Sequence, residues 1–256
     1  MIGCIIQARM GSSRLPGKTL IKLDEHRSTL DFVVNQLSFS TLLDKIVIAT
    51  TNLEQDDIIK KNAETLGIDC FRGSSDDVLD RYYHCAKEFQ INTIVRITSD
   101  CPLIDPQIVD QVIKKYQYED YDYVTNTLIR SYPIGTDVEI FSFETLEKTW
   151  QKAILPSERE HVTLFIRNKK SGFKLGNLKN SKNLSRLRWT LDREEDLNLI
   201  RRIVVKVNKN PILMNDILNL FSVEPELIKI NEHIPENEGL LKSLKKDEEF
   251  QNLKTD

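Results

Sequence analysis

The stretch MIGCIIQARMGSSRLPGKT, residues 1–19, decides the fold, because an apolar segment leads directly into a loop rich in glycine and cations. Its ending, GKT, matches the phosphate-binding loop of P-loop ATPases and GTPases, which requires four residues between its two glycines. Five residues separate Gly11 from Gly17 here, and Pro16 lacks the N–H that such a loop would donate to a phosphate. The stretch therefore predicts a first strand followed by a different kind of phosphate loop.

Apolar segments alternate with amphipathic helices through the first half of the chain. Residues 1–7, 45–50 and 93–98 are rich in Ile and Val without strict polar alternation, which is typical of parallel strands buried on both faces. Helices are predicted between and after these strands. This alternation predicts an α/β fold with a doubly wound sheet, in which ligands bind at the carboxyl ends of the strands.

Capping residues mark the predicted helix ends. Asn52 and Gln55 have capping-box spacing, and Gly67 is expected to end the helix that they begin. A second helix is predicted from about residue 76. Asp105 is expected to cap a third helix, whose first residue is Pro106.

The second half of the chain predicts a smaller, mixed part of the same sheet. Strands are expected in YDYVTN (121–126), TDVEIFS (136–142), GFKLGNL (172–178) and RLRWTL (186–191). A helix, SEREHVTLFIRNKK (157–170), lies among them, with Ser157 and Glu160 at capping-box spacing. We therefore expect antiparallel pairing at one side of the sheet. Because no linker or repeat divides the chain, we expect one domain over residues 1–245 and a polar, helical tail over 246–256.

Composition limits the partners. With 36 basic and 39 acidic side chains the net charge is −3, so the chain lacks the positive field of a general nucleic-acid binder, and any anion site must be local. The four cysteines show no C-x-x-C spacing, which argues against a zinc site and fits a reducing cytoplasm. The apolar start is too short to span a bilayer, so we expect an untargeted protein without a membrane partner.

The opening loop is the first candidate site. It carries Arg9, Arg14 and Lys18 close to Gly11 and Ser12, at the end of the first strand. Three cations on a short loop suit a polyanion, because Arg is a two-pronged donor, Lys is a point charge, and glycine lets the backbone approach phosphate oxygens. A solvated basic turn is the structural alternative.

Two carboxylates follow later strands. Asp100 comes two residues after a buried strand. A carboxylate that faces a triphosphate is repelled unless a cation lies between them, so Asp100 is predicted to be a magnesium ligand. The alternative is a turn residue before Pro102. Asp192 ends a predicted strand and has Glu195 at capping-box spacing, so it is either a second metal ligand or a helix cap. The combination of both acids with a basic loop favours a metal and phosphate site.

Other polar residues are less informative. Arg72 ends the predicted short strand DCFRG and either reaches a nucleotide or pairs with Asp76 or Asp77. The four histidines form no Ser/His/Asp or Cys/His arrangement, so hydrolysis through a triad is not expected.

These residues resemble a known family. IIQARMGSSRLPGKTL is similar to the signature of cytidylyltransferases that activate sugars as CMP derivatives, including the 3-deoxy-manno-octulosonate and acylneuraminate enzymes. The strongest likeness is to the spore-coat polysaccharide (SpsF-like) branch. It continues in order through ATTNLEQDD, FRGSSDDVLDRYY, RITSDCPLIDP, PIGTDVEIF, EREHVTLFIRN, RWTLDREEDL and INEHIPENEGLLKSL, from Ile2 to about Leu244. The family's fold is a Rossmann-like, GT-A-like nucleotidyltransferase sheet with a small antiparallel extension.

The resemblance implies a role for each candidate. The backbone at Ala8 and Arg9 is expected near the base, and the side chains of Ser12, Arg14 and Lys18 near the phosphates, with Lys18 and Arg14 catalytic. The remaining implied residues are Gly11, Arg72 and Thr98 for the nucleotide, Asp100 and Asp192 for Mg²⁺, and, more weakly, Asp137, Glu139, Glu160 and His161 for the acceptor. Thr98 stands where the ulosonic-acid enzymes have a Gln, and Leu164 stands where related sequences have a Pro. The family's contacts with the base, the ribose and the acceptor are therefore the least transferable to this chain.

The expected reaction is transfer of CMP from CTP to a small sugar or sugar-like acceptor, with release of pyrophosphate, for polysaccharide or glycan biosynthesis. CTP rather than GTP or UTP, and a homodimer, are implied by the resemblance alone. One alternative is a nucleotide-sugar-dependent glycosyltransferase, but its D-x-D metal motif does not follow a central strand, since DYD (120–122) precedes its strand. A catalytically silent nucleotide-binding subunit is the other alternative.

Overall fold

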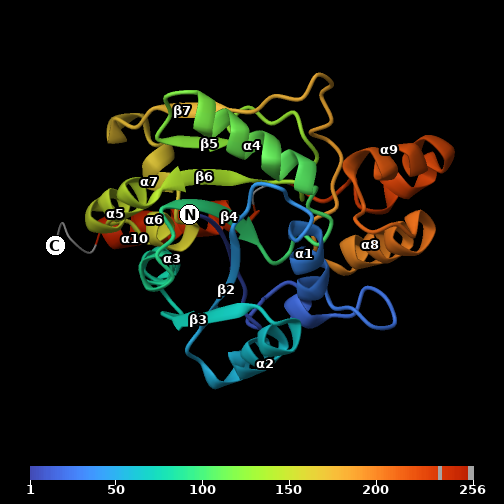
Figure 1. The fold of residues 1–256 in the computed structure, drawn as a ribbon, viewed down its shortest axis with the longest axis horizontal. Helices are drawn as coiled ribbons and strands as arrows, with labels where there is room; N and C mark the ends of the chain where they lie inside the picture. Colours follow the sequence, from blue (N-terminus) through green and yellow to red (C-terminus); the bar gives the residue numbers. More distant parts are fainter. Residues whose placement is uncertain (236–237, 253–256) are drawn as a thin grey trace.

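Parallel strands form the centre of the protein in a computed structural model, which describes residues 1–235 and 238–252 (Figure 1). Within these residues one seven-stranded sheet has the order β3-β2-β1-β4-β6-β5-β7. Strands β3, β2, β1 and β4 are parallel, β6 is antiparallel to both of its neighbours, and β5 is parallel to β7. The strands are β1 (Ile2–Gln7), β2 (Lys45–Thr51), β3 (Asp69–Gly73), β4 (Thr93–Thr98), β5 (Tyr123–Thr125), β6 (Glu139–Ser142) and β7 (Leu175–Asn177).

The predicted α/β sheet is confirmed, including its antiparallel side, but one predicted strand is wrong. RLRWTL (186–191) makes only a single bridge, between Arg188 and Ile134. The Trp189 N–H donates to the Ile134 carbonyl at 2.9 Å, and the chain then turns toward the end of β4, where the Leu191 N–H donates to the Asp100 carbonyl. The segment therefore leaves the sheet and delivers its residues to the end of a neighbouring strand.

Helices cover both faces of the sheet (Figure 1). Apolar side chains alternate along the strands, so that Ile6 packs with α1, α2 and α4 while Ile5 packs with α3, α5 and α7. A third apolar cluster around Trp189 joins α8 and α9, which lie at the right of Figure 1. The helices are α1 (Thr29–Leu37), α2 (Asp57–Leu66), α3 (Val78–Glu88), α4 (Pro106–Tyr118), α5 (Phe143–Lys152), α6 (Pro156–His161), α7 (Leu164–Arg167), α8 (Glu194–Val207), α9 (Met214–Val223) and α10 (Glu238–Asn252), with 3₁₀ turns at Lys18–Leu20, Glu54–Asp56, Lys169–Ser171 and Pro225–Ile230.

Two of the three predicted caps in the first half are confirmed. Asp105 accepts a hydrogen bond from the Gln107 N–H at 2.8 Å ahead of Pro106, and Gly67 ends α2 with a φ of 68°. The capping box predicted from Asn52 is wrong, because a 3₁₀ turn precedes α2 and the helix begins at Asp57.

The helix predicted over residues 157–170 is broken into two pieces. Val162 has a φ of 62° and separates α6 from α7. Ser157 does not cap α6; Glu158 accepts from the Leu155 N–H at 3.2 Å instead, and the Ser157 hydroxyl donates to Asp247 of α10 at 2.5 Å. The break lets α6 present its polar residues to another helix.

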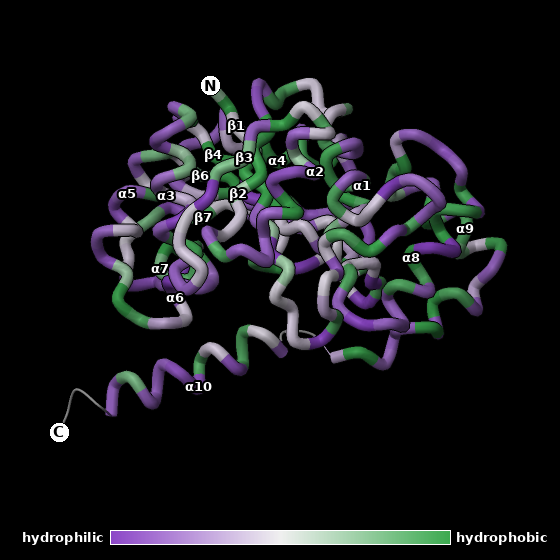
Figure 2. Tube along the Cα trace, turned by 90° about the horizontal axis from the view of Figure 1, so that it is seen from below, coloured by the Kyte–Doolittle hydropathy of each residue, from purple (hydrophilic) through white to green (hydrophobic). Residues whose placement is uncertain are grey.

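That other helix, α10, runs beneath α6 and α7 in Figure 2 and contacts α6. The predicted boundary at residue 245 falls inside α10, which continues to Asn252, and residues 253–256 of the predicted tail lie outside the described residues. No helix in the described part of the chain is long and apolar enough to cross a membrane.

A substitution at Gly135 tests how closely its backbone packs against the segment around Trp189. Its φ is 104°, and a Cβ there would lie 2.7 Å from the Thr190 backbone nitrogen. We expect Gly135→Ala to lower the free energy of unfolding by more than about 2 kcal/mol, because backbone rather than a flexible side chain must move. Gly67→Ala is the matched control, since its φ is also positive but nothing lies within 4 Å of the added Cβ. Chemical denaturation measures both, and equal losses would contradict the expectation.

Candidate active site

The opening loop is held by hydrogen bonds from three directions. The Ala8 N–H donates to the Ala49 carbonyl at 3.1 Å, and the Met10 N–H donates to the Asp56 carboxylate at 2.7 Å. The Thr19 hydroxyl closes the loop by donating to the Arg9 carbonyl at 3.0 Å. A short 3₁₀ turn follows, not the long helix of a P-loop, which agrees with the rejection of that motif.

Lys18 joins the two predicted metal ligands. Because β1 pairs with β4 in parallel, with Gln7 opposite Thr98, the loops that follow the two strands lie beside each other. The Lys18 Nζ is 2.7 Å from Asp100 Oδ2 and 2.5 Å from Asp192 Oδ1. Arg14 Nη2 is 2.8 Å from Asp192 Oδ2. The structure thus brings together the four predicted catalytic and metal-binding residues.

The segment before Asp192 is hydrogen-bonded to the backbone of Asp100. The Leu191 N–H donates to the Asp100 carbonyl at 2.7 Å, and the Thr190 hydroxyl donates to the same oxygen at 3.0 Å. These bonds place the two carboxylates next to each other although 92 positions separate them in the sequence.

Asp196, which the sequence reasoning missed, caps the helix that Asp192 and Glu195 were predicted to cap. Its carboxylate accepts from the N–H groups of Asp192 and Arg193 at 2.9 and 3.0 Å, and from the Arg188 guanidinium. It is fully buried. The capping interpretation of Asp192 is therefore wrong, and its carboxylate is available to the site. Three acids follow one another within DREED, so spacing alone did not identify the cap.

Lys18 and Asp100 each stabilise the charged form of the other. Burial by itself would lower the pKa of Lys18, but Asp100 and Asp192 outweigh it and raise that pKa above its usual value. Burial would likewise raise the pKa of Asp100, but the Lys18 ammonium and the Thr98 hydroxyl outweigh it and lower that pKa. Lys18 and Asp100 are therefore both charged near neutral pH.

The two carboxylates fit a magnesium ion. Asp100 and Asp192 converge on one point, which the Lys18 ammonium takes in this structure. Carboxylate oxygens are ligands that Mg²⁺ prefers, and Mg²⁺ commonly uses only one or two of them together with water and substrate phosphates. Among the described residues no group of three or more His, Cys, Asp or Glu side chains forms a complete metal cage, so substrate oxygens would have to complete the coordination.

Two cavities meet at this site. The smaller, of about 400 Å³, is lined by seven of the eight predicted nucleotide-binding residues: Ala8, Arg9, Gly11, Ser12, Arg14, Lys18 and Thr98. The larger, of about 540 Å³, is lined by the predicted acceptor residues Asp137, Glu139 and His161. The two cavities share five residues, Arg14, Thr98, Asp100, His161 and Gly239.

Arg72 is the predicted nucleotide residue that lines neither cavity. Its guanidinium is held by Asp57 and by the Thr51 and Leu53 carbonyls, so the predicted pairing with Asp76 or Asp77 is wrong.

The smaller cavity is strongly cationic. Among its described lining residues are six cations and two carboxylates. Three of the cations were missed by the sequence reasoning: Arg81, Lys242 and Lys246. Arg81 is buried; within the part of the chain that the structure describes, its Nη1 donates to the Ser74 carbonyl at 3.0 Å, its Nε has no partner and it forms no ion pair with a carboxylate. A buried guanidinium without a carboxylate partner suits an anionic ligand, but a single Arg in an amphipathic helix carries no sequence signal of this.

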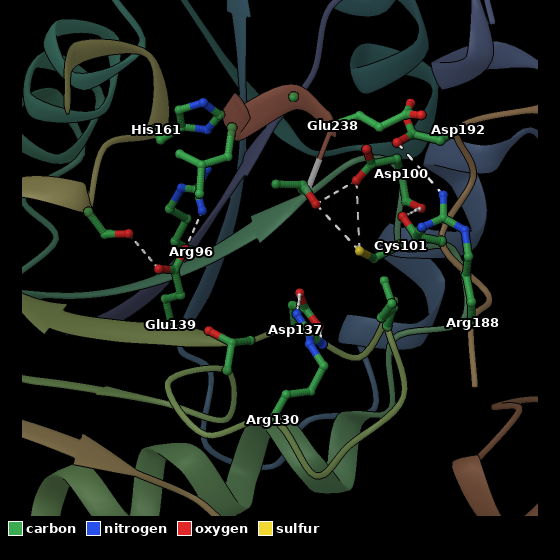
Figure 3. Close-up of a pocket in the computed structure, with 18 of the residues that line it drawn as sticks. Arg96, Asp100, Cys101, Arg130, Asp137, Glu139, His161, Arg188, Asp192 and Glu238 are labelled. Carbon is green, nitrogen blue, oxygen red and sulfur yellow. Dashed lines mark hydrogen bonds and ion pairs between the residues drawn. The ribbon is translucent and has the colours of Figure 1, made fainter. Parts of the chain in front are cut away.

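Charges in the larger cavity are mostly paired (Figure 3). Asp137 accepts two hydrogen bonds from Arg130, at 2.6 and 2.7 Å. Glu139 is bound by Arg96, by the Tyr123 hydroxyl at 2.5 Å and by the Thr163 hydroxyl at 2.6 Å. Both predicted acceptor residues are thus held in place before any ligand binds.

Glu160 and His161 face α10. The Ser243 hydroxyl lies 2.8 Å from Glu160 Oε2 and 2.9 Å from His161 Nε2. Glu160 lines the smaller cavity and not the larger one, whereas His161 lines both. Burial, with Arg96 nearby, lowers the pKa of His161, so its ring is neutral near pH 7.

Comparison with known proteins gives a consistent result. Residues 3–217 match the profile of the cytidylyltransferase family. The spore coat polysaccharide biosynthesis protein SpsF of Bacillus subtilis (strain 168) is 33% identical over 232 residues, which cover 87% of this chain and 94% of SpsF. A solved structure of a cytidylyltransferase from Leptospira borgpetersenii serovar Hardjo-bovis is 34% identical, with a TM-score of 0.85 over 89% of this chain and 96% of that one.

A more distant solved structure shares the fold. It is a CMP:2-keto-3-deoxy-manno-octonic acid synthetase complexed with CTP, with a TM-score of 0.61 over 80% of this chain and 98% of that one. Its identity of 14% shows the fold alone. The nucleotidyltransferase fold expected from the sequence is confirmed.

Replacing Lys18 by Met tests the charge arrangement. The change leaves the carboxylates of Asp100 and Asp192 facing each other. We therefore expect the free energy of unfolding to fall by about 2 kcal/mol at pH 7. This is less than the ~3–5 kcal/mol lost when a fully buried pair is broken, because the Asp100 side chain keeps 26% exposure. Without the ammonium, burial is the main remaining influence on Asp100 and raises the folded-state pKa of that carboxyl. Its destabilising effect therefore appears as pH rises, and the gap to wild type narrows as pH falls from 7 toward 3.

Thermal denaturation across this pH range measures the effect. Lys148→Met is the matched control, because Lys148 also pairs with an acid, Glu144 at 2.7 Å, but on the surface. We expect no measurable change in its melting temperature at any pH. A Lys18→Met variant as stable as wild type at pH 7 would contradict the expectation.

Proposed function

The chain belongs to the cytidylyltransferase family, and on that premise we propose that it transfers CMP from CTP to a sugar or sugar-like acceptor and releases pyrophosphate. The observation that carries the proposal is the meeting of two cavities at Asp100 and Arg14, one strongly cationic and one with largely paired charges. Such a layout suits a triphosphate on one side and a polar acceptor on the other, with the α-phosphorus between them. The likeness to SpsF supports a role in making a surface polysaccharide or glycan.

In the proposed reaction an acceptor oxygen, either anionic already or after its hydroxyl proton passes to water, attacks the α-phosphorus of CTP in line. The new oxygen–phosphorus bond forms as the bond to the bridging oxygen of pyrophosphate breaks, and pyrophosphate leaves with that electron pair. Negative charge then grows on the non-bridging oxygens and on pyrophosphate, where Lys18 and Arg14 are placed to stabilise it. No covalent enzyme intermediate is required.

Asp100 and Asp192 are the residues that would hold Mg²⁺, which would supply further positive charge to the phosphate oxygens. Since Lys18 holds these carboxylates in the structure, we propose that its ammonium moves to the phosphates when nucleotide binds. The carboxylates of Asp100 and Asp192 would then face Mg²⁺ in place of the Lys18 ammonium. Neither carboxylate would be left without a cation.

One residue favours an acidic acceptor. Arg167 lines the larger cavity, and within the described residues its side chain makes no hydrogen bond or ion pair. Its charge acts on Glu139, whose pKa burial would raise, and helps to lower that pKa. We propose that Arg167 pairs with a carboxylate or phosphate of the acceptor.

Nucleotide choice is tested by a thermal-shift screen of CTP, UTP, GTP and ATP with Mg²⁺. We expect CTP to stabilise the protein most, because a ligand at 100 times its Kd adds about 2.7 kcal/mol to the free energy of unfolding. A larger shift with GTP or UTP would overturn the choice of CTP.

Catalysis is tested by pyrophosphate release from CTP with a panel of acidic sugars, neutral sugars and sugar phosphates. We expect release with acidic acceptors, and a fall of about 100-fold or more in kcat/KM for Lys18→Ala and Asp100→Asn, about 2.7 kcal/mol of transition-state stabilisation. Lys22→Ala is the control, because Lys22 follows the same loop but lines neither cavity.

Three results would count against these assignments. Variants within about threefold of wild type would remove Lys18 and Asp100 from the reaction. Glycosyl transfer without pyrophosphate would favour the glycosyltransferase, and metal-dependent CTP binding without turnover across the panel would favour a silent nucleotide-binding subunit.

A further inference from the structure

The C-terminal helix α10 lines both cavities. Its first turn, Glu238, Gly239 and Leu240, lines the larger cavity. Gly239, Lys242, Ser243 and Lys246 line the smaller one. Four of the residues around the proposed nucleotide site therefore come from a helix that follows the sheet by more than 60 residues and lies beneath the body in Figure 2.

Polar contacts hold α10 in place. Asp247 accepts from the Ser157 N–H at 2.8 Å and from its hydroxyl, and Ser243 bonds Glu160 and His161. At the other end Glu238 accepts two hydrogen bonds from Arg193, both at 2.8 Å.

Two of the four large apolar side chains of α10, Leu240 and Phe250, are half-buried, and the other two are exposed. Leu241 and Leu244 remain 59% and 43% exposed. The contacts of Asp247 with Ser157 are buried, whereas the Arg193–Glu238 pair is partly exposed and adds little net free energy. A ligand that binds both the helix and the body would strengthen the docking of α10.

Lys242 is the residue of α10 that can supply such a contact. It lines the smaller cavity, and its side chain makes no hydrogen bond or ion pair with the described residues. Lys246, one turn later, lines the same cavity and is 3.5 Å from Glu160. Lys245 lies between them in sequence but lines neither cavity.

We propose that Lys242 binds the phosphates of the nucleotide, with Lys246 beside it, so that α10 forms one wall of the nucleotide site. The cations of the body, Arg9, Arg14, Lys18 and Arg81, line the same cavity. A triphosphate held between the two sets would draw α10 onto the body through charge-assisted hydrogen bonds. This inference rests on the proposed function, because it takes the ligand of that cavity to be a nucleoside triphosphate.

The test compares CTP binding to four proteins: wild type, Lys242→Ala, Lys242→Arg and Lys245→Ala. Calorimetry with MgCTP gives the Kd, and steady-state kinetics give KM for CTP. We expect Lys242→Ala to weaken CTP binding about tenfold, Lys242→Arg to restore most of it, and Lys245→Ala to stay within twofold of wild type. The melting temperature of each unliganded protein should be unchanged, because Lys242 is exposed and makes no hydrogen bond or ion pair with the described residues.

The outcomes separate the two proposals. Wild-type protein that binds no CTP would overturn the proposed function. Wild type that binds CTP, with Lys242→Ala indistinguishable from Lys245→Ala, would overturn the role of α10 alone. Equal losses in Lys242→Ala and Lys242→Arg would also overturn it, because positive charge would then not be what the nucleotide requires.

Discussion

The ammonium of Lys18 between the carboxylates of Asp100 and Asp192 is the interaction around which this protein is arranged. It joins three segments that are distant in sequence, and each reaches the point for a separate structural reason. Parallel pairing of β1 with β4 puts the opening loop beside Asp100. Two hydrogen bonds to the Asp100 carbonyl then carry the chain to Asp192. All three segments must therefore be in place for the two carboxylates to share the Lys18 ammonium.

Two groups of acidic side chains have different roles around the site. Asp56, Asp196 and Glu139 are buried and accept several hydrogen bonds each, so they fix a loop, a helix start and a cavity wall. Asp100 and Asp192 instead point to a cation at the junction of two cavities. Buried carboxylates with complete sets of donors are structural because their charge is already compensated. Those whose partner is a movable ammonium are available for a ligand.

The cations likewise differ in whether a carboxylate compensates their charge. In the larger cavity most guanidiniums face a carboxylate, as Arg130 faces Asp137. In the smaller cavity cations outnumber acids among the described lining residues, and no described carboxylate forms an ion pair with the buried Arg81. An excess of positive charge in a partly enclosed space is costly unless an anion enters it. The smaller cavity thus has the electrostatics of a polyanion site, and α10 adds to its positive charge.

The sequence by itself determined the central sheet, because runs of Ile and Val without polar alternation require burial on both faces and the βα alternation requires parallel strands. It also predicted that Lys18 and Asp100 lie together, since the loops after parallel strands meet at one edge, whereas Asp192 reaches them on a segment that leaves the sheet. It did not identify Asp196 as the cap of α8, the break at Val162, or Arg81 and Lys242 as lining residues. These depend on which of several equivalent acids finds a buried donor, and on which helix faces a cavity. Such contacts join residues far apart in the chain, so only the tertiary structure decided them.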